Sequence, residues 1–372
     1  MVGSVMAADL SREAGFSVLL ADRSSAALER ARARTPGLQT LEADLSDTAT
    51  ITRLASEADV VCGALASHLG HAAIGAVIEA GKPYADISFM AEDFRSHSPQ
   101  AAERGVTAIV DCGVAPGMSN LLAAWGASRL DRCEAVEILV GGLPVERNWP
   151  WEYKAGFAPA DVIEEYVRPA RQVENGEVVV HEALSEPELV HFEGLGSLEA
   201  FHTDGLRSLT ETLGDIPNIR EKTLRYPGHI ERMRALREAG FFSTEEIEVK
   251  GVRIRPLDVT SALLFPQWTY EEGEEDLTVM RISAEGTEGS RRVRHCWDLN
   301  DVYSREERAS SMARTTALPC AIVARWLASG ELSAPGVHAP EVLATGPWPE
   351  RMLAELEARG VTYTYRLEEL GS

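Results

Sequence analysis

Over its first 110 residues the chain alternates short apolar segments with helical ones, which restricts its fold more than any other feature. The apolar segments lie at Phe16–Ala21, Leu38–Glu42, Asp59–Gly63, Tyr84–Ile87 and Thr107–Val110. Strands that alternate with helices of about 10–15 residues are typical of βαβ units, in which the strands are parallel. The sequence therefore predicts an α/β fold that begins with a parallel-sheet domain.

The first residues match the end of a dinucleotide-binding fingerprint. In GxGxxG the third glycine opens the first helix, and an acidic residue lies about 20 residues beyond the motif. Gly3, the helical segment after it and Asp22 fit this spacing. We therefore expect a Rossmann-type domain whose first strand and first two glycines would precede Met1. An in-frame strand ending in GxG upstream would support this hypothesis, and the alternative is that Gly3 is a flexible terminal residue.

Asp22 follows the predicted strand, where its carboxylate can accept hydrogen bonds from a ribose 2′-hydroxyl. This favours NAD over NADP, although Arg23 could hold a 2′-phosphate. Asp44 and Leu45 would flank the adenine, and the small apolar loop that contains Ala64 and Leu65 could approach the nicotinamide half. The same region carries His68 and His71, but without a third ligand nearby we predict no metal.

The segment AIVDCGVAPGMSN, residues 108–120, is the predicted centre of the site. An apolar strand ends at Asp111-Cys112-Gly113, Pro116-Gly117 indicates a turn, and Ser119 or Asn120 can cap the following helix. A strand, a tight loop and a helix would place Asp111 and Cys112 at the carboxyl edge of the sheet, where open α/β sheets bind ligands. The alternative is an ordinary strand-to-helix connection.

The composition of the chain indicates which kinds of partner it is unsuited to bind. The net charge of −22 disfavours nucleic acid and anionic membranes, and no run approaches about 18 apolar residues. We therefore expect a cytoplasmic protein with a small-molecule substrate. The five cysteines are widely spaced and never form CxxC, so neither disulfides nor a zinc site are indicated.

Beyond residue 118 the pattern changes to that of an α+β domain. Predicted strands at Val178–Ala183 and Glu188–Phe192, a helix at Asp204–Leu213 and a hairpin of Leu277–Ala284 with Ser290–Leu299 indicate a mixed sheet. We expect a dinucleotide-binding domain at 1–118, an inserted catalytic and dimerisation domain at 119–303, and C-terminal helices at 304–372 that return to the first domain. The hairpin could pair across a two-fold axis, which favours a homodimer or higher homo-oligomer.

Several motifs resemble those of the saccharopine reductase and lysine 6-dehydrogenase superfamily over about residues 1–345. They are DCGVAPG, YADISFM, EYKAGFAP, GLGSLEAFHTDGLRSL, TLRYPGH and MARTTALPCAIVARWLASGELSAPGVHAPE. The joint occurrence of TLRYPGH and LEAFHTDGLRSL looks most like the lysine 6-dehydrogenase branch. The resemblance implies an N-terminal Rossmann domain, an inserted mixed α/β catalytic domain and returning C-terminal helices.

The resemblance also implies where ligands bind. The dinucleotide would contact Met1, Val2, Gly3, Asp22, Arg23, Asp44, Leu45, Ala64, Leu65 and Ser88. The amino-acid substrate would contact Asp86, Asp111, Cys112, Tyr153, Lys154, Thr203, Asp204, Arg225, Tyr226 and His229. Among these, the catalytic candidates are His229, Lys154 and Asp111.

Amine chemistry assigns roles to these residues. An ω-amine of pKa near 10.4 releases hydride only when neutral, and its deprotonation at pH 7 costs about 4–5 kcal/mol. His229 is the first choice of base because histidine titrates near neutrality, with a helix-capping role as the alternative. Lys154 could serve if burial lowered its pKa. Arg225 suits a substrate carboxylate, or could pair with Glu221.

Asp111 or Asp204 could hold an ammonium group, although Asp204 could instead cap the following helix. Cys112 is a small contact, since hydride transfer needs no nucleophile. The sequence thus predicts NAD-dependent oxidative deamination of the ω-amine of L-lysine or a related amino acid. The alternatives are a reductase of the saccharopine or carboxynorspermidine type that forms a carbon–nitrogen bond with NADPH, and a non-catalytic dinucleotide-binding protein.

Overall fold

The computed structural model describes residues 2–157 and 159–371, and the chain divides into two compact units. Unit 1 comprises Met1–Leu122 and Ala313–Val361, and unit 2 comprises Ala123–Met312 and Thr362–Ser372. The sequence prediction returned all of 304–372 to the first domain. Residues 313–361 do so, whereas the last strand pairs with β15 (Arg291–Val302) in unit 2.

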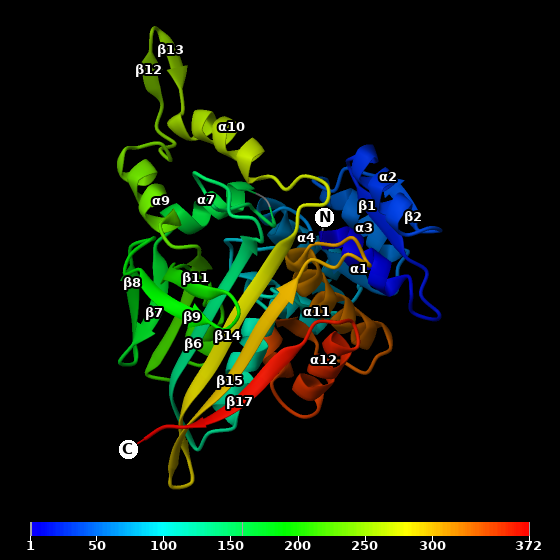
Figure 1. The fold of residues 1–372 in the computed structure, drawn as a ribbon. Helices are drawn as coiled ribbons and strands as arrows, with labels where there is room; N and C mark the ends of the chain where they lie inside the picture. Colours follow the sequence, from blue (N-terminus) through cyan, green and yellow to red (C-terminus); the bar gives the residue numbers. More distant parts are fainter. Residues whose placement is uncertain (1, 158, 372) are drawn as a thin grey trace. The chain divides into compact units, whose positions relative to one another are not determined.

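Unit 1 contains parallel strands flanked by helices (Figure 1). Its strands are β1 (Leu19–Asp22), β2 (Gln39–Glu42), β3 (Val61–Gly63), β4 (Tyr84–Asp86), β5 (Thr107–Ile109) and β16 (Gly336–His338). Its helices include α1 (Val2–Leu10), α2 (Ser25–Arg34), α3 (Thr48–Ser56), α4 (Ser67–Glu79), α5 (Ser98–Glu103), α12 (Trp348–Glu357) and the short 3-10 helices η1 (Phe94–His97) and η2 (Pro340–Leu343). Two further helices, α6 (Met118–Ser128) and α11 (Ser311–Ala328), contribute residues to both units.

The strands of unit 1 form two groups. Four of them pair in the order β16-β5-β4-β3, and β1 pairs with β2 in a separate two-stranded sheet. Among the described residues, no strand joins β1 to β3. That position is where the sequence analysis expects an upstream strand, and this expectation stays a prediction.

Local sequence explains where these elements begin. Ser24 Oγ accepts from the Ala27 N–H and caps α2, while the Asp47 carboxylate accepts from two N–H groups and caps α3. Apolar residues of α4, β5 and β16 then form one buried cluster that includes Ile74, Ile78, Ala108 and Val337. The predicted alternation of strands and helices is therefore present.

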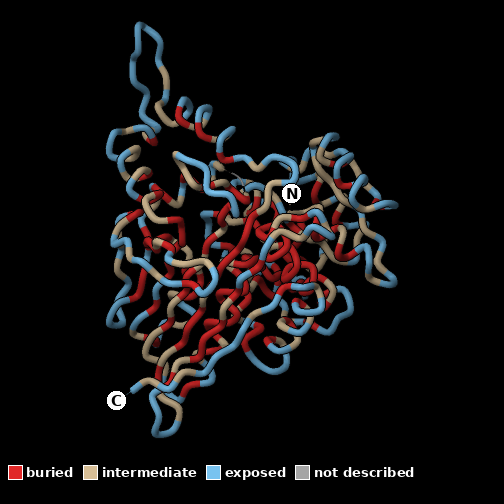
Figure 2. Tube along the Cα trace, in the orientation of Figure 1, coloured by how far each residue is buried: buried red, intermediate tan, exposed pale blue. Residues whose placement is uncertain are grey.

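Unit 2 is built on a nine-stranded mixed sheet whose long strands are largely buried (Figure 2). Its strands are β6 (Arg132–Pro144), β7 (Ala170–Glu174), β8 (Glu177–His181), β9 (Glu188–Phe192), β10 (Gly196–His202), β11 (Asn218–Arg225), β14 (Asp276–Glu288), β15 and β17 (Tyr363–Glu369). Its helices include α7 (Pro159–Val167), α8 (Leu209–Thr212), α9 (His229–Glu238) and α10 (Pro256–Trp268). A separate hairpin of β12 (Ile247–Val249) and β13 (Val252–Ile254) precedes α10. The pair β6 and β11 is parallel and the other pairings of the large sheet are antiparallel, which gives the expected α+β architecture.

The predicted helix at Asp204–Leu213 is wrong for most of its length. Only α8 is helical, and Ser208 occupies its N-cap position. Asp204 does not cap it, because its carboxylate accepts the Arg171 N–H over 3.2 Å and pairs with the Arg171 guanidinium over 2.9 Å. In the described parts of both units, no helix is both long enough and apolar enough to cross a bilayer.

Candidate active site

The carboxyl end of β4 carries a carboxylate buried away from solvent. Asp86 is the last residue of β4 and is fully buried, and the Ser88 hydroxyl donates to its Oδ1 over 2.9 Å. The Tyr84 hydroxyl bonds to the same carboxylate. Among the described residues, Asp86 Oδ2 has no hydrogen-bond partner. Because a buried polar atom is costly to leave unpaired, this oxygen marks a place where a donor on a ligand would fit.

The environment of Asp86 changes its acidity. Burial raises its pKa to about 6 and Asp111 adds to the shift, whereas the hydrogen bonds from Ser88 and Tyr84 oppose it. A carboxyl group that titrates close to neutral pH is suited to act as an acid or a base. The sequence analysis placed Asp86 in the substrate site and Asp111 in the catalytic group, and the structure brings the two together.

The turn after β5 joins this site. The Cys112 N–H donates to the carbonyl oxygen of Asp86 over 2.8 Å, which ties the carboxyl ends of β4 and β5 together. Asp111 has a left-handed φ of 53°, a strained conformation for a residue with a side chain. Burial raises the pKa of the Cys112 thiol, so it is neutral at physiological pH, as a contact role requires. The strand, turn and helix predicted over residues 108–120 are present.

Glycine is required at one position of this turn. Gly117 has a φ of 140°, and a Cβ there would overlap the backbone of Gly113. The Asn120 side chain accepts the Gly117 N–H over 3.2 Å, and the Met118 N–H donates to the Gly113 carbonyl over 2.9 Å. These bonds hold the turn in one conformation and start α6.

The start of α1 lies beside the loop after β3. A Cβ on Gly3 would lie 3.5 Å from the Ala64 Cβ, so two residues predicted to bind the dinucleotide are neighbours. Val2 begins α1, and Met1 lies outside the described residues. A helix N-terminus carrying a glycine fits the phosphates of a dinucleotide. The residues present therefore fit NAD(P) at this end of the sheet.

The predicted ribose and adenine residues lie at the ends of β1 and β2. Asp22 is the last residue of β1, and its Oδ1 accepts the Ser24 N–H over 2.8 Å, while Arg23 is exposed. Hydrogen bonds from Ser46 lower the pKa of Asp44. Leu45 and Leu65 pack against the buried cluster of unit 1 that includes Ile74 and Ile78, and both stay partly exposed.

Gly63 leaves no room for a side chain beside the Asp86 carboxylate. A Cβ on Gly63 would overlap the Tyr84 hydroxyl and Asp86 Oδ1. We expect Gly63→Ala to lower the free energy of unfolding by about 1–3 kcal/mol, because both groups must move. Urea denaturation measures this change. Gly75→Ala, at a helical position where a Cβ would lie 3.1 Å from the His97 ring, is the control and should cost less, because the contact is longer and a helix favours alanine over glycine. Equal stability of the two variants would show that a side chain does fit at position 63 beside Asp86.

In unit 2, a buried guanidinium pairs with a carboxylate that is partly exposed. Arg225 ends β11 and its Nη2 lies 2.7 Å from Glu165 Oε2. Its Nε donates to the Tyr166 hydroxyl over 3.3 Å, and its guanidinium lies over the Tyr153 ring. The alternative role for Arg225, an exposed charge paired with Glu221, is wrong, because helix α7, which the sequence analysis did not predict, places Glu165 beside the buried Arg225. Its main assignment, to a substrate carboxylate, stays a prediction.

His229 is held on both sides of its ring. It is fully buried, with Nδ1 2.8 Å from the Trp151 carbonyl and Nε2 2.9 Å from the Tyr166 hydroxyl. A carbonyl only accepts, so Nδ1 donates to Trp151 and Nε2 accepts from Tyr166. Burial, with a contribution from Arg225, lowers the pKa of His229 to about 3. The reason for choosing it as a base, a pKa near neutrality, is therefore wrong in this environment.

This geometry changes the effect expected of a substitution. His229→Ala should cost about 2–4 kcal/mol of folding stability, because it removes a buried ring and strands its two partners. Chemical denaturation of the variant beside the exposed His191→Ala measures the loss. A stable variant with a maximal rate about 100-fold lower would instead restore the base assignment.

Thr203 lies beside the buried Glu221, which the sequence analysis considered only as a partner of Arg225. The Thr203 hydroxyl donates to Glu221 Oε2 over 2.6 Å, and the Gly205 N–H donates to the same oxygen over 3.1 Å. Burial raises the pKa of Glu221 to about 8. Alternation along β11, which places Glu221, Thr223 and Arg225 on one face, was the signal that could have revealed it.

The remaining predicted substrate residues have separate partners. Lys154 forms an ion pair with Glu274. The Tyr226 hydroxyl donates to the Pro144 carbonyl over 2.9 Å, and the Tyr153 and His229 ring centroids lie 5.0 Å apart. The structure thus gathers Tyr153, Arg225 and His229 in one cluster, while Asp204 and Lys154 are held by other charges.

A parallel-sheet domain that fits a dinucleotide, a titratable carboxyl at its strand ends and a second mixed-sheet domain define a two-domain NAD(P)-dependent oxidoreductase. Residues 1–109 match the family model of the saccharopine dehydrogenase NADP binding domain, and residues 113–361 match that of the saccharopine dehydrogenase C-terminal domain. The chain belongs to the saccharopine dehydrogenase family. The fold class and the family resemblance predicted from the sequence are confirmed.

Relatives match along nearly the whole chain. The saccharopine dehydrogenase [NADP(+), L-glutamate-forming] of Schizosaccharomyces pombe is 22% identical, and the match covers 93% of each chain. The apo structure of the L-Glu-forming enzyme of Saccharomyces cerevisiae aligns with a TM-score of 0.81 at 18% identity and covers 100% of this chain and 98% of that one. A homospermidine synthase from Legionella pneumophila in complex with NAD aligns with a TM-score of 0.67 at 11% identity, covering 98% and 89%. At these identities the two structures show a shared fold.

Proposed function

We propose that the chain catalyses the reversible NAD(P)-dependent oxidation of a secondary amine that joins an amino acid to a second carbon skeleton. The observation that carries this proposal is the buried Asp86 carboxyl, with its pKa of about 6, at the strand ends of the dinucleotide domain. A bound NAD(P) would supply hydride exchange. The names of the fungal relatives, which describe L-glutamate-forming saccharopine dehydrogenases, support this reaction type over simple deamination.

Asp86 would handle the proton of this reaction. Oxidation removes a hydride from carbon and a proton from nitrogen, which leaves a C=N bond. Water adds to that bond, and cleavage of the carbon–nitrogen bond releases an amine and an aldehyde. We assign the nitrogen proton to Asp86 Oδ2, which has no partner among the described residues, while Ser88 and Tyr84 orient the carboxylate.

Unit 2 contains side chains of the kinds that bind the polar groups of such a substrate. Arg225 suits a carboxylate through its planar donors, and the Tyr153 and Thr203 hydroxyls can hydrogen bond to polar groups. Because Glu165 already neutralises Arg225, a substrate carboxylate would have to share the guanidinium with Glu165.

That neutralised arginine favours a second candidate, the oxidative deamination of L-lysine at its ω-amine. Lysine carries one carboxylate, whereas a glutamate-forming substrate carries more, so it demands fewer cations. The motifs TLRYPGH and LEAFHTDGLRSL, which resemble the lysine 6-dehydrogenase branch, agree with this candidate.

A substrate panel separates the candidates. Saccharopine, L-lysine and polyamines would each be assayed with NAD and with NADP. Turnover of saccharopine that releases L-glutamate would support the first proposal, and turnover of L-lysine alone would support the second. Binding of NADH by calorimetry without turnover of any amine would identify a non-catalytic dinucleotide-binding protein.

The rate of amine oxidation should rise steeply from pH 7 to pH 10. Only the neutral amine releases hydride, and an amine of pKa near 10.4 gains about tenfold in its neutral fraction per pH unit. Asp86, with its pKa of about 6, is already ionised across this range and does not limit the rise. Initial rates at saturating nucleotide measure the profile. A flat profile would remove the deprotonation step from the proposed mechanism.

The homodimer or higher homo-oligomer predicted from the sequence stays a prediction. Light scattering of the purified chain at several concentrations measures its mass in solution and distinguishes a dimer from a monomer.

A further inference from the structure

Two histidines and two glutamates meet in unit 2, and none has a role in the proposed reaction. His181 ends β8, Glu186 lies in the loop before β9, and His202 ends β10. Each of these three offers a ligand atom, and the three atoms lie within 4.8 Å of one another. Glu186 Oε1 is 3.7 Å from His181 Nδ1, and Glu186 Oε2 is 3.3 Å from His202 Nε2.

We propose that His181, Glu186 and His202 bind a divalent transition-metal ion of the zinc class. Imidazole nitrogen and carboxylate oxygen are ligands that zinc, cobalt and nickel share. Three protein ligands leave a fourth position for water. The proposal is independent of the reaction assigned above and contrasts with the metal-free prediction made from the sequence.

A second carboxylate supports His181 as a ligand. Glu174 Oε1 lies 2.6 Å from His181 Nε2, so this nitrogen donates to Glu174 and leaves the Nδ1 lone pair on the side of Glu186. Histidines that bind metals commonly donate their other N–H to a carboxylate in this way, which fixes the tautomer and raises the basicity of the ligand.

His202 brings a buried ring with a spare nitrogen. Its side chain is 5% exposed, and within the described residues its Nδ1 is buried without a hydrogen-bond partner. Either ring nitrogen can therefore be turned to a metal at the cost of one hydrogen bond, the one to Glu186.

Metal binding requires a small rearrangement. The two rings are stacked, with centroids 4.3 Å apart and an angle of 11° between their planes, whereas a shared metal must lie close to both ring planes. Tetrahedral ligands with bonds of about 2.1 Å lie about 3.4 Å apart. One imidazole must turn and the exposed Glu186 carboxylate must close in, by movements of about 1–2 Å.

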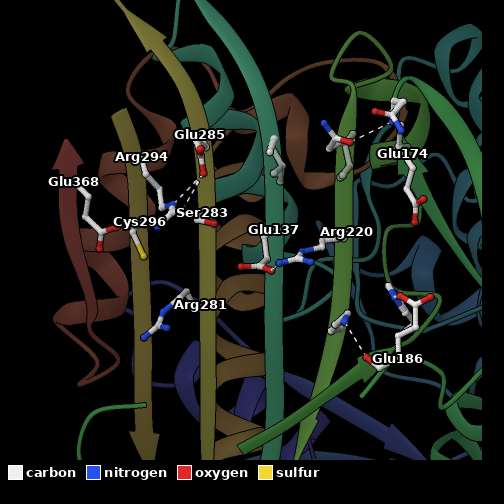
Figure 3. A pocket seen from close by; sticks show the side chains of 18 of the residues that line it. Glu137, Glu174, Glu186, Arg220, Arg281, Ser283, Glu285, Arg294, Cys296 and Glu368 are labelled. Carbon is white, nitrogen blue, oxygen red and sulfur yellow. Dashed lines mark hydrogen bonds and ion pairs between the residues drawn. The ribbon is translucent and has the colours of Figure 1, made fainter. Parts of the chain in front are cut away.

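The cluster opens onto a cavity of about 550 Å³ on the face of the sheet. Glu174, Glu186 and His202 line part of it, and Figure 3 shows Glu174 and Glu186 on the same side of the cavity. The cavity gives water and an ion a path to the site. Lys222 is also close, but Glu188 pairs with its ammonium over 2.8 Å, so the carboxylates outnumber the cations at the cluster.

Cobalt(II) binding to the chelator-treated full chain tests the proposal. We expect one equivalent of Co²⁺ to give visible d–d bands without a thiolate charge-transfer band, because no cysteine takes part. Zn²⁺ at a hundredfold excess over its Kd should raise the Tm by about 3 °C or more. His181→Asn and His202→Asn should each abolish the bands, and Glu174→Gln should weaken binding about 10–100-fold.

The exposed His191→Asn is the matched control and should bind as the wild type does. Circular dichroism of each metal-free variant establishes that it folds, and Glu186→Gln, at an exposed position, tests the site even if a buried histidine variant does not fold. Absence of saturable binding, a thiolate band, or binding that survives the His181→Asn/His202→Asn double substitution would each overturn the proposal.

Discussion

Replacing Asp86 by asparagine should lower kcat at least about 100-fold while stabilising the folded protein at pH 8. The loss of rate follows from its proposed role in proton transfer, which contributes about 10²–10⁴-fold. The gain in stability follows from burial, because an ionised carboxylate without solvent is unfavourable. Its folded pKa of about 6 lies above the ordinary 3.8, so the folded state binds the proton more tightly than the unfolded state.

The sign of this effect fixes its pH dependence. The destabilising contribution of Asp86 is fully present above pH 6 and is relieved as the pH falls towards 4. A shift of this size corresponds to at most about 3 kcal/mol, and we expect about 1–3 kcal/mol at pH 8. The difference in stability between variant and wild type should therefore shrink from pH 7 to pH 4.

Urea denaturation at several pH values and steady-state kinetics measure the two effects. Asp59→Asn, at an exposed position, is the matched control and should change neither. A variant that is less stable than the wild type at pH 8 would show that Asp86 is a structural hydrogen-bond acceptor. Undiminished kcat would remove it from catalysis.

Removing Glu165 should destabilise the protein by about 3–5 kcal/mol. In Glu165→Leu the Arg225 guanidinium keeps its charge but loses its carboxylate partner. That charge is buried, because only 3% of the Arg225 side chain is exposed. The double variant Glu165→Leu/Arg225→Met removes both charges and should recover most of the loss, because apolar residues can replace a buried pair. The exposed pair Arg255 and Asp258 gives the control, and Asp258→Ala should cost less than about 1 kcal/mol.

The same double variant tests whether Arg225 binds substrate. With the fold restored, a raised KM at nearly unchanged kcat would assign Arg225 to the substrate carboxylate. Unchanged KM would leave Arg225 with a structural role alone. A double variant as unstable as Glu165→Leu would instead show that a methionine side chain cannot replace the contacts of the Arg225 guanidinium with the Tyr153 and Tyr166 rings.

The sequence by itself determined the architecture of the dinucleotide domain. Apolar strands with helical segments between them can bury their faces only as a parallel sheet covered by helices. Glycine and proline at 113, 116 and 117 restrict the backbone locally, so the turn that presents Asp111 and Cys112 could be read without knowing its surroundings. For the second domain, the prediction of an inserted mixed α/β fold came from the motifs that resemble the family.

The tertiary structure alone decided which side chains meet and how acidic they are. Arg225 and Glu165 are 60 residues apart in the chain. Their pairing depends on the packing of α7 against α9 and α10, which brings Glu165 to the end of β11. Burial moves the pKa of His229 to about 3, of Asp86 to about 6 and of Glu221 to about 8, and no local pattern encodes these values. Periodicity and turn chemistry act between near neighbours in sequence, whereas desolvation and charge pairing depend on the whole fold.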